Sequence, residues 1–349
     1  MAMNQWVKSI AVFGMFALLM GCADSAQRLK PAPDHLVWPP PPEIPRIQFV
    51  ASVTTPRDMG IGRSIFRKMF DYLVGRKPAA MVSPYGIEVD QEGRVYVVDT
   101  YLKTVHVFDV PGNRYYQFPK EPGALEFPVD LSIDHETGLI YVTDSQAKVV
   151  KIFSNRGKSF VGLLGRGDLE RPTGIAINKK TSELLVVDTL SANIVRYALE
   201  SRMMKGFFGL PGKQPGHFHF PTNIFATSDG RFVVSDSLNF RVQVFSSRGL
   251  PERVFGSRGN RPGSFARPRG VAVDSDGNIY VVDALFDVVQ IFDSAGRLLM
   301  DFGGPGSDAG KFWLPTGITI DAHDLIYVSD QFNHRVQVFK YLKQGEAPK

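Results

Sequence analysis

Six aspartates recur along the chain and form the largest set of residues that could do chemistry. They are separated by 44 to 48 residues, and they are Asp99, Asp144, Asp188, Asp236, Asp283 and Asp330. Carboxylates can act as acids, bases or metal ligands, but a single site cannot use one residue from the same point of every repeat. We therefore predict that each carboxylate accepts hydrogen bonds from backbone N–H groups in the turn that follows it.

Two histidines form a second candidate. His217 and His219 are separated by one residue, so on an extended segment both side chains point the same way and could hold zinc or calcium. A third ligand would have to come from another part of the fold, for example His334. We expect packing or surface roles for these histidines and no cofactor, with a metal site as the alternative. No Ser-His-Asp arrangement, phosphate loop or cysteine nucleophile is recognisable in the sequence.

The elements around these residues repeat with the same period. Each repeat opens with a proline and an apolar strand, then a second strand that ends on the aspartate, then a third that ends on an aromatic residue. The first copy runs from Pro84 to Phe108, and the last from Pro315 to Phe339. A period in the forties built from strands and turns is typical of a β-propeller blade. The sequence predicts an all-β, six-bladed propeller over residues 46–342, with a tail at 343–349.

The ends of the repeat region indicate how the ring closes. Five repeats continue with a fourth strand, predicted at 114–118, 159–164, 203–208, 252–255 and 298–302. The last repeat has no such strand after Phe339, so we expect residues 46–53 to pair outside its third strand and protect both edges. Residues 63–74 carry apolar side chains at helical spacing. They predict a short helix that caps one end of the propeller or, as a basic amphipathic helix, touches anionic lipid.

The N-terminal residues predict export and lipid anchoring. Residues 1–21 contain one charge and a short apolar run, which is typical of a signal peptide. Leu19-Met20-Gly21-Cys22 resembles a bacterial lipobox, so Cys22 is the expected site of lipid attachment. Residues 22–45 include seven prolines between residues 31 and 45, which favours an extended tether. We expect a membrane lipoprotein that faces the periplasm or the cell surface, on the outer membrane if the host is Gram-negative.

The repeats resemble those of the NHL family. The resemblance is carried by Asp236-Ser-Leu-Asn-Phe-Arg-Val-Gln-Val-Phe245, by Asp330-Gln-Phe-Asn-His-Arg-Val-Gln-Val-Phe339 and by Gly-x-Phe-x-x-Pro connectors such as Gly310–Pro315. It implies an NHL-type propeller, but this fold hosts binding domains, sensors, RNA binders and a lyase whose zinc is held by histidines from separate blades. The third repeat departs at 193–197, where we expect a bulge. His106 takes the place of a glutamine found in other repeats, which predicts a solvent-facing strand position.

One face of the predicted disc is the expected interaction surface. The connectors before each proline and the loops after each aspartate meet there, and the residues just after the prolines should ring the mouth of the channel. Apolar residues two positions after the aspartates recur, which indicates packing between blades. The side chains expected to contact a partner are Tyr85, Asp130, Arg269, Phe240, Phe286 and Phe332. The alternative is that the aromatic rings tuck between blades.

The composition narrows the class of function. The formal net charge of +5 is small for 349 residues and is not gathered in runs, so we expect no nucleic-acid binding. We predict a monomeric, non-enzymatic scaffold that is anchored to a membrane through lipid and presents a rigid propeller face to a cell-envelope protein or peptide. The alternative is a metal-dependent envelope lyase or lactonase-like hydrolase with its site at the channel mouth.

Overall fold

The computed structural model describes residues 36–62, 80–343 and 345. The chain divides into two units, residues 1–34 and 35–349. The predicted signal peptide, Cys22, the start of the tether and the helix expected at 63–74 all lie outside the described residues. None of the helices in the described segments is long and apolar enough to cross a membrane.

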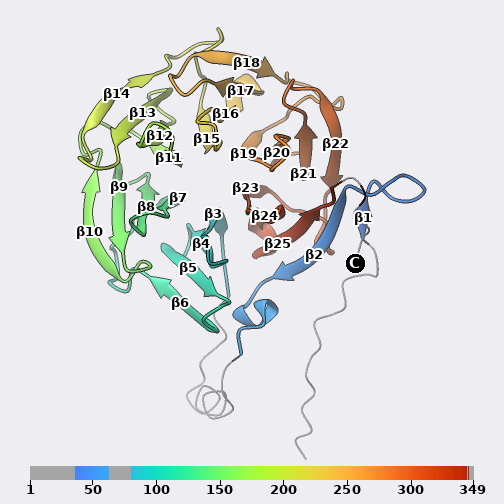
Figure 1. The fold of residues 1–349 in the computed structure, drawn as a ribbon, viewed down its shortest axis with the longest axis horizontal. Helices are drawn as coiled ribbons and strands as arrows, with labels where there is room; N and C mark the ends of the chain where they lie inside the picture. The colour runs from blue at the N-terminus through green and yellow to red at the C-terminus, as the bar shows by residue number, and fades with distance from the viewer. Residues whose placement is uncertain (1–35, 63–79, 344, 346–349) are drawn as a thin grey trace, which may run out of the picture. The chain divides into compact units, whose positions relative to one another are not determined.

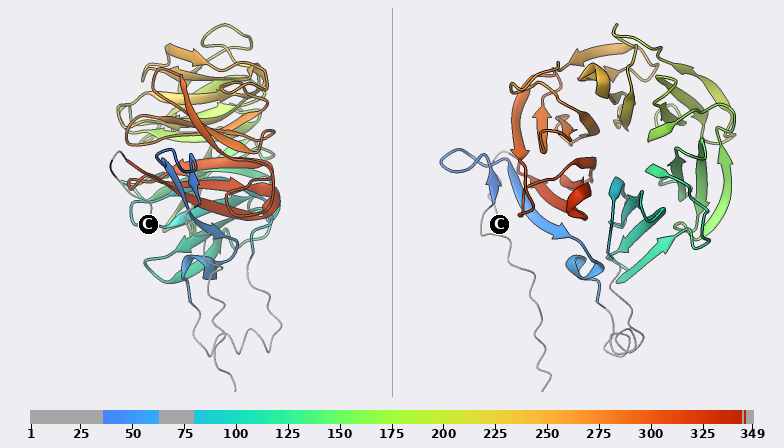
Figure 2. Two further views of the ribbon diagram at one scale, coloured as in Figure 1. Left: turned by 90° about the vertical axis from the view of Figure 1, so that its right-hand side faces the viewer. Right: turned by 180° about the vertical axis from the view of Figure 1, so that it is seen from behind.

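The second unit is a six-bladed β-propeller, as predicted, with six sheets arranged around an axis (Figure 1). Figure 2 shows the same ring edge-on and from behind. In the first three blades the strands run in chain order from the axis outward. They are β3 (Pro84–Val89), β4 (Val95–Asp99), β5 (Thr104–Asp109) and β6 (Arg114–Phe118); β7 (Pro128–Asp134), β8 (Leu139–Asp144), β9 (Val149–Ser154) and β10 (Ser159–Leu164); and β11 (Pro172–Asn178), β12 (Glu183–Asp188), β13 (Asn193–Ala198) and β14 (Met204–Phe208).

The remaining blades follow the same order, except at the outer edge of the last. They are β15 (Pro221–Ala226), β16 (Phe232–Asp236), β17 (Arg241–Phe245) and β18 (Pro251–Phe255); β19 (Pro268–Val273), β20 (Ile279–Asp283), β21 (Val288–Phe292) and β22 (Leu298–Gly303); and β23 (Pro315–Ile320), β24 (Leu325–Asp330) and β25 (Arg335–Tyr341). Three short 3-10 turns are η1 (Pro56–Met59), η2 (Ser237–Asn239) and η3 (Gln331–Asn333).

The N-terminal strand closes the ring, as predicted. β2 (Ile47–Val53) pairs antiparallel with β25, and Val53 lies opposite Val336. The tether ends earlier than expected, because β1 (Val37–Trp38) pairs with β2. The ring of Trp38 lies 5.9 Å from Phe302 and 5.8 Å from Phe339, so this aromatic side chain gains enough apolar contact to order its segment. The prediction of a tether over residues 22–45 was wrong for these residues.

The core lies between neighbouring sheets. Side chains from the facing strands of two blades form each apolar cluster, and the cluster that joins the last blade to the first contains Val336 and Ile87. Three connectors add a fully buried phenylalanine each, Phe218, Phe265 and Phe312. A Cβ at Gly256 would stand 2.4 Å from the ring of Phe265, so the glycine nine residues earlier makes room for it. In the third blade, β12 and β13 pair in continuous register, and the irregularity expected at 193–197 lies between β13 and β14, where the register shifts between Arg196 and Tyr197.

Candidate functional site

The first strand of each blade begins, and the second strand ends, on the same face of the ring. The proline that opens each first strand lies opposite the aspartate that ends the second, as in the pairs Pro84 and Asp99 or Pro315 and Asp330. The connectors between blades and the loops after the aspartates therefore lie on the same side, which we call the connector face. This is the side on which the sequence predicts an interaction surface.

The six aspartates hold the connector face together. Asp99 Oδ1 accepts hydrogen bonds from the backbone N–H groups of Tyr101 and Leu102, which is the role predicted from the repeat. Its Oδ2 also accepts one of 2.7 Å from Val82 N in the preceding connector. Asp283 makes the equivalent bonds to Ala266 N and Arg267 N. These carboxylates are buried and saturated with hydrogen bonds, so they are structural groups.

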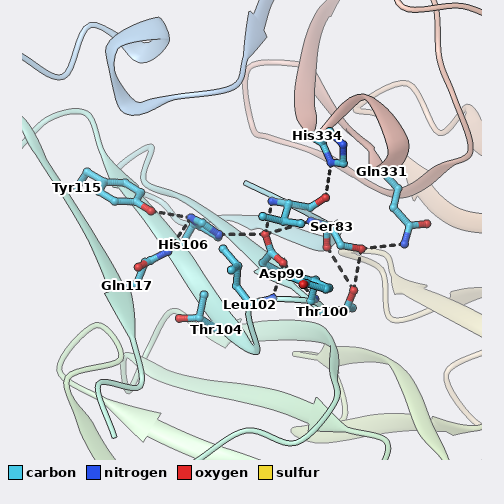
Figure 3. Close-up of polar contacts among 12 residues, drawn as sticks. Ser83, Asp99, Thr100, Leu102, Thr104, His106, Tyr115, Gln117, Gln331 and His334 are labelled. Atoms are coloured by element: carbon cyan, nitrogen blue, oxygen red, sulfur yellow. Dashed lines mark hydrogen bonds and ion pairs between the residues drawn. The ribbon is translucent and has the colours of Figure 1, made fainter. Parts of the chain in front are cut away.

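His106 is fully buried, so the prediction of a solvent-facing position was wrong (Figure 3). Its Nε2 lies 3.3 Å from Asp99 Oδ2, and its Nδ1 lies 2.7 Å from the Tyr115 hydroxyl. In other blades, glutamines such as Gln337 contact the aspartate from the same place. Burial alone would raise the pKa of Asp99, but the hydrogen bonds from His106 and from backbone N–H groups hold that pKa below its ordinary value.

A hollow opens at the axis of the connector face, where the sequence places the channel mouth. It is narrow, because the centre of a water-sized sphere has only about 10 Å³ to move in, which is room for about one water molecule. Its lining residues come from five blades and are Tyr85, Gly86, Val129, Asp130, Thr222, Asn223, Arg269, Gly270, Thr316 and Gly317. The structure therefore brings together Tyr85, Asp130 and Arg269, three of the six side chains expected to contact a partner.

Asp130 is the most perturbed side chain in the hollow. Its carboxylate accepts hydrogen bonds of 2.9 Å from Leu131 N and 3.0 Å from Asn223 Nδ2. Burial nevertheless raises the pKa of Asp130 to about 7, because desolvation outweighs these bonds. Glu88 is also affected: burial first, and the charge of Asp130 second, raise its pKa to about 8.

Arginines stack on aromatic rings across the connector face. The guanidinium of Arg269 lies 5.5 Å from the centre of the Tyr85 ring, and its Nη1 is 3.4 Å from the Tyr85 hydroxyl. Arg258 stacks on Phe240 in the same way, and Arg171, in the connector into the third blade, stacks on Phe220, in the connector into the fourth. Within the described ranges, none of these arginines makes a salt bridge. Their positive charge is therefore available to a ligand.

The three phenylalanines expected to contact a partner differ in their surroundings. Phe240 is half-buried and packs against the cluster between the fourth and fifth blades, and Phe286 is also half-buried. Phe332 is 47% exposed, and its ring lies 5.7 Å from the ring of Trp313, which is 54% exposed. Only Phe332 therefore stands clear on the face, and it does so with a partner, Trp313, that the repeat did not single out.

The position two residues after each aspartate faces solvent, so its interpretation as packing between blades was wrong. In five blades it holds a large apolar side chain with an exposed fraction between 40% and 73%. These residues are joined on the same face by two exposed aromatics of the connectors. We call the set the apolar crown: Tyr101, Phe127, Leu190, Leu238, Leu285, Trp313 and Phe332. A recurring apolar residue fits packing and a displayed surface equally well, so the sequence could not separate the two.

The histidine candidates do not gather into a metal centre. His217 is half-buried, with a buried Nδ1 that has no hydrogen-bond partner, while His219 is exposed. His334 is instead engaged elsewhere, because its Nδ1 donates to the carbonyl oxygen of Val82 (Figure 3). Across residues 36–62, 80–343 and 345, no three His, Cys, Asp or Glu side chains lie together in a way that could hold a metal ion.

Comparisons with known proteins agree with the fold. Residues 265–287 and 312–339 match the family model of the NHL repeat, which supports an NHL-type propeller. Over 182 residues the chain is 28% identical to Protein STRICTOSIDINE SYNTHASE-LIKE 2 of Arabidopsis thaliana, a match that covers 43% of this chain. The chain therefore spans only 45% of the length of that curated relative.

Solved propellers resemble the structure at low sequence identity. A streptogramin B lyase has a TM-score of 0.56 at 16% identity and covers 75% of this chain and 94% of its own. Virginiamycin B lyase from Staphylococcus aureus has a TM-score of 0.55 at 15% identity, and the match covers 75% of this chain and 96% of the lyase. An auxiliary nutrient binding protein from Bacteroides thetaiotaomicron has a TM-score of 0.59 at 15% identity, and the match covers 75% of this chain and 69% of the binding protein. At these identities the likeness shows the fold alone.

Proposed function

We propose that this NHL-type propeller is a binding scaffold of the cell envelope that presents its connector face to a protein or peptide. The observation that carries the proposal is the apolar crown, which places exposed apolar side chains from five blades around one hollow. Large exposed apolar patches on rigid proteins mark interaction sites, with aromatic side chains as the usual anchors. The lyase and nutrient-binding neighbours are compatible with ligands held by this fold.

The rigidity of the face supports a binding role. The aspartates fix both the connectors and the loops, so the crown side chains stand on backbone that is already ordered. A preformed site loses little conformational entropy on binding, which leaves more of the contact energy for affinity. The protein would act as a monomer, held to a membrane by lipid at Cys22, with the partner in the same compartment.

The test compares two pairs of exposed apolar residues. Trp313→Ala with Phe332→Ala removes the aromatic part of the crown, whereas Phe207→Ala with Leu299→Ala removes equally exposed side chains from the outer strands β14 and β22. Full-length protein carrying a photo-crosslinker is incubated with envelope extract. We expect wild type and the outer-strand variant to capture the same partner and the crown variant to lose it. Capture that is unchanged in a folded crown variant would rule out this face.

A further inference from the structure

Positive charge is gathered on one part of the connector face. This part consists of the connectors into the fourth and fifth blades, residues 209–220 and 256–267, and of the loops after the aspartates of those blades, residues 237–240 and 284–287. We call it the basic sector. It carries one acid and four basic residues, which are Lys213, Arg258, Arg261 and Arg267. The corresponding connectors and loops of the second and third blades carry four basic and four acidic residues, so the surplus is local.

The basic side chains of this sector have no counterion of their own. All four are exposed, and none of them makes a salt bridge within the described ranges. The one acid, Asp287, is half-buried and accepts a hydrogen bond of 2.7 Å from Leu314 N. The guanidinium of Arg258 is held 5.4 Å from the centre of the Phe240 ring, which limits where its charge can lie.

The parts of the basic sector are in direct contact with one another. Asn239 Nδ2 donates a hydrogen bond of 2.8 Å to the carbonyl oxygen of Gly212, and Ala284 N donates one of 3.1 Å to the carbonyl oxygen of Arg267. Arg241, which lies beneath, donates to three carbonyl oxygens of the connector 209–220. The sector is therefore continuous, and its backbone is ordered before a partner arrives, which lowers the entropy cost of binding.

Apolar side chains stand among these charges. Leu238 and Leu285 of the apolar crown are 40% and 55% exposed, and Leu210, in the connector into the fourth blade, is 57% exposed. A partner that covers the leucines also removes water from the neighbouring cations. Desolvating a charge is costly unless an opposite charge replaces the water. The surface therefore suits a partner that offers apolar side chains and negative charges together.

We propose that the basic sector binds an acidic segment of the partner protein, in which apolar residues stand between aspartates or glutamates. The inference rests on the proposed function and names the chemistry of the partner. Three of the four cations are arginines, whose planar fork can donate two parallel hydrogen bonds to one carboxylate. A local surplus of positive charge also attracts an acidic segment and orients it during approach.

An anionic bilayer also combines negative charge with apolar groups, but it fits the charge distribution less well. A bilayer is broad and would meet the whole connector face at once. Glu121, Glu126 and Asp168 are exposed on the connectors into the second and third blades, and anionic lipid would repel them. A segment of a protein can cover the basic sector alone, so it avoids this repulsion.

The probe is a pool of fluorescein-labelled dodecapeptides in which glutamate alternates with leucine or phenylalanine. A matched pool carries glutamine in place of glutamate. Anisotropy with full-length protein should show about tenfold tighter binding of the acidic pool. The preference should shrink as the NaCl concentration rises from about 0.05 M to about 0.5 M, because salt screens exposed charges.

Two charge-matched double variants locate the site. The sector variant, Arg258→Gln with Arg261→Gln, should reduce the preference for the acidic pool to about twofold. The control variant, Arg156→Gln with Arg248→Gln, removes the same charge from exposed loops at the other end of the blades and should leave the preference unchanged. A preference that survives in the folded sector variant, or that both variants lose equally, would overturn the basic sector as the site.

The remaining outcomes separate this inference from the proposed function. Equal binding of the two pools, or binding of neither pool to folded wild type, would overturn the acidic partner. The photo-crosslinking comparison of the crown and outer-strand variants decides the binding face independently. Sedimentation with phosphatidylglycerol vesicles tests the bilayer, with Cys22→Ala in every protein to remove the lipid. Vesicle binding that the sector variant loses, without a preference between the peptide pools, would assign the sector to lipid instead.

Discussion

Asp130 in the second blade accepts a hydrogen bond of 3.0 Å from Asn223 in the fourth. The third blade between them contributes Gly174, where a Cβ would stand 2.6 Å from the Cα of Asn223. Asn223 also accepts a hydrogen bond from Val271 N of the fifth blade. A small polar bridge therefore ties the second, fourth and fifth blades at the axis, with Gly174 of the third blade packed closely against it.

The stability of the protein should fall as the pH rises from about 4 to 7. The pKa of Asp130 is raised in the folded state to about 7, so over this range the folded chain holds a proton that the unfolded chain has released. The loss is at most about 4 kcal/mol, since a tenfold change in proton affinity corresponds to about 1.4 kcal/mol. Asp130→Asn mimics the protonated group, so urea unfolding at pH 5 and pH 8 should show a smaller difference in the free energy of unfolding. An equal change in the free energy of unfolding between pH 5 and pH 8 in wild type and variant would contradict this.

Gly317→Ala should destabilise the ring. A Cβ at this position would stand 2.1 Å from the carbonyl oxygen of Tyr85, which is backbone and cannot rotate away. Overpacking of this kind typically costs about 1–3 kcal/mol. Gly62→Ala is the matched control, because nothing lies within 4 Å of its Cβ. Thermal unfolding should show a lower Tm for the first variant only, and equal Tm values would count against close packing at the axis.

His106→Gln should be tolerated, whereas His106→Leu should not. Glutamine at this position in other blades contacts the aspartate, so it can keep a donor beside Asp99. Leucine leaves the buried carboxylate with one partner fewer, a loss of about 1–3 kcal/mol. The free energy of unfolding in urea measures both effects. Equal destabilisation by the two substitutions would show that ring packing, and not the hydrogen bond, is what matters.

Cys22→Ala should abolish lipid attachment. When the full chain is expressed in a Gram-negative host with radiolabelled palmitate, wild type should carry the label and partition with membranes. The variant should lose the label and remain as unprocessed precursor, because the cysteine supplies the thiol that is acylated. Ser25→Ala, close to it in the sequence, is the control and should behave as wild type. Label that persists in Cys22→Ala would exclude this site.

Purified protein should contain no stoichiometric zinc or calcium. His217 and His219 have no third ligand among the described residues, and two histidines alone hold zinc weakly. Inductively coupled plasma mass spectrometry on wild type and His217→Ala measures this directly. A stoichiometric metal that His217→Ala removes would favour a metal-dependent lyase or hydrolase over a scaffold.

The repeat pattern was sufficient for the blades but not for the crown. Pro84 and Asp99 recur with their neighbours in every copy, so strand order, ring closure and the role of the aspartates followed from comparing copies. Phe332 and Leu285 also recur, but repetition cannot say whether a side chain packs or is displayed. His106 looked exposed because polar residues on strands usually face solvent, and here the position is a buried link to the aspartate. Trp38 lies in a proline-rich stretch. The proline content predicted an extended tether, so the packing of this one ring against the propeller was missed.

The pairing of β2 with β25 sets an order of events during synthesis. The first of these strands is made before any blade, and the second is made only after five blades have been completed. Until Arg335–Tyr341 emerges, the edge of β2 that pairs with β25 has no partner strand, and the ring stays open. A chain truncated before β25 therefore cannot close its ring, because the last blade needs both β2 and β25.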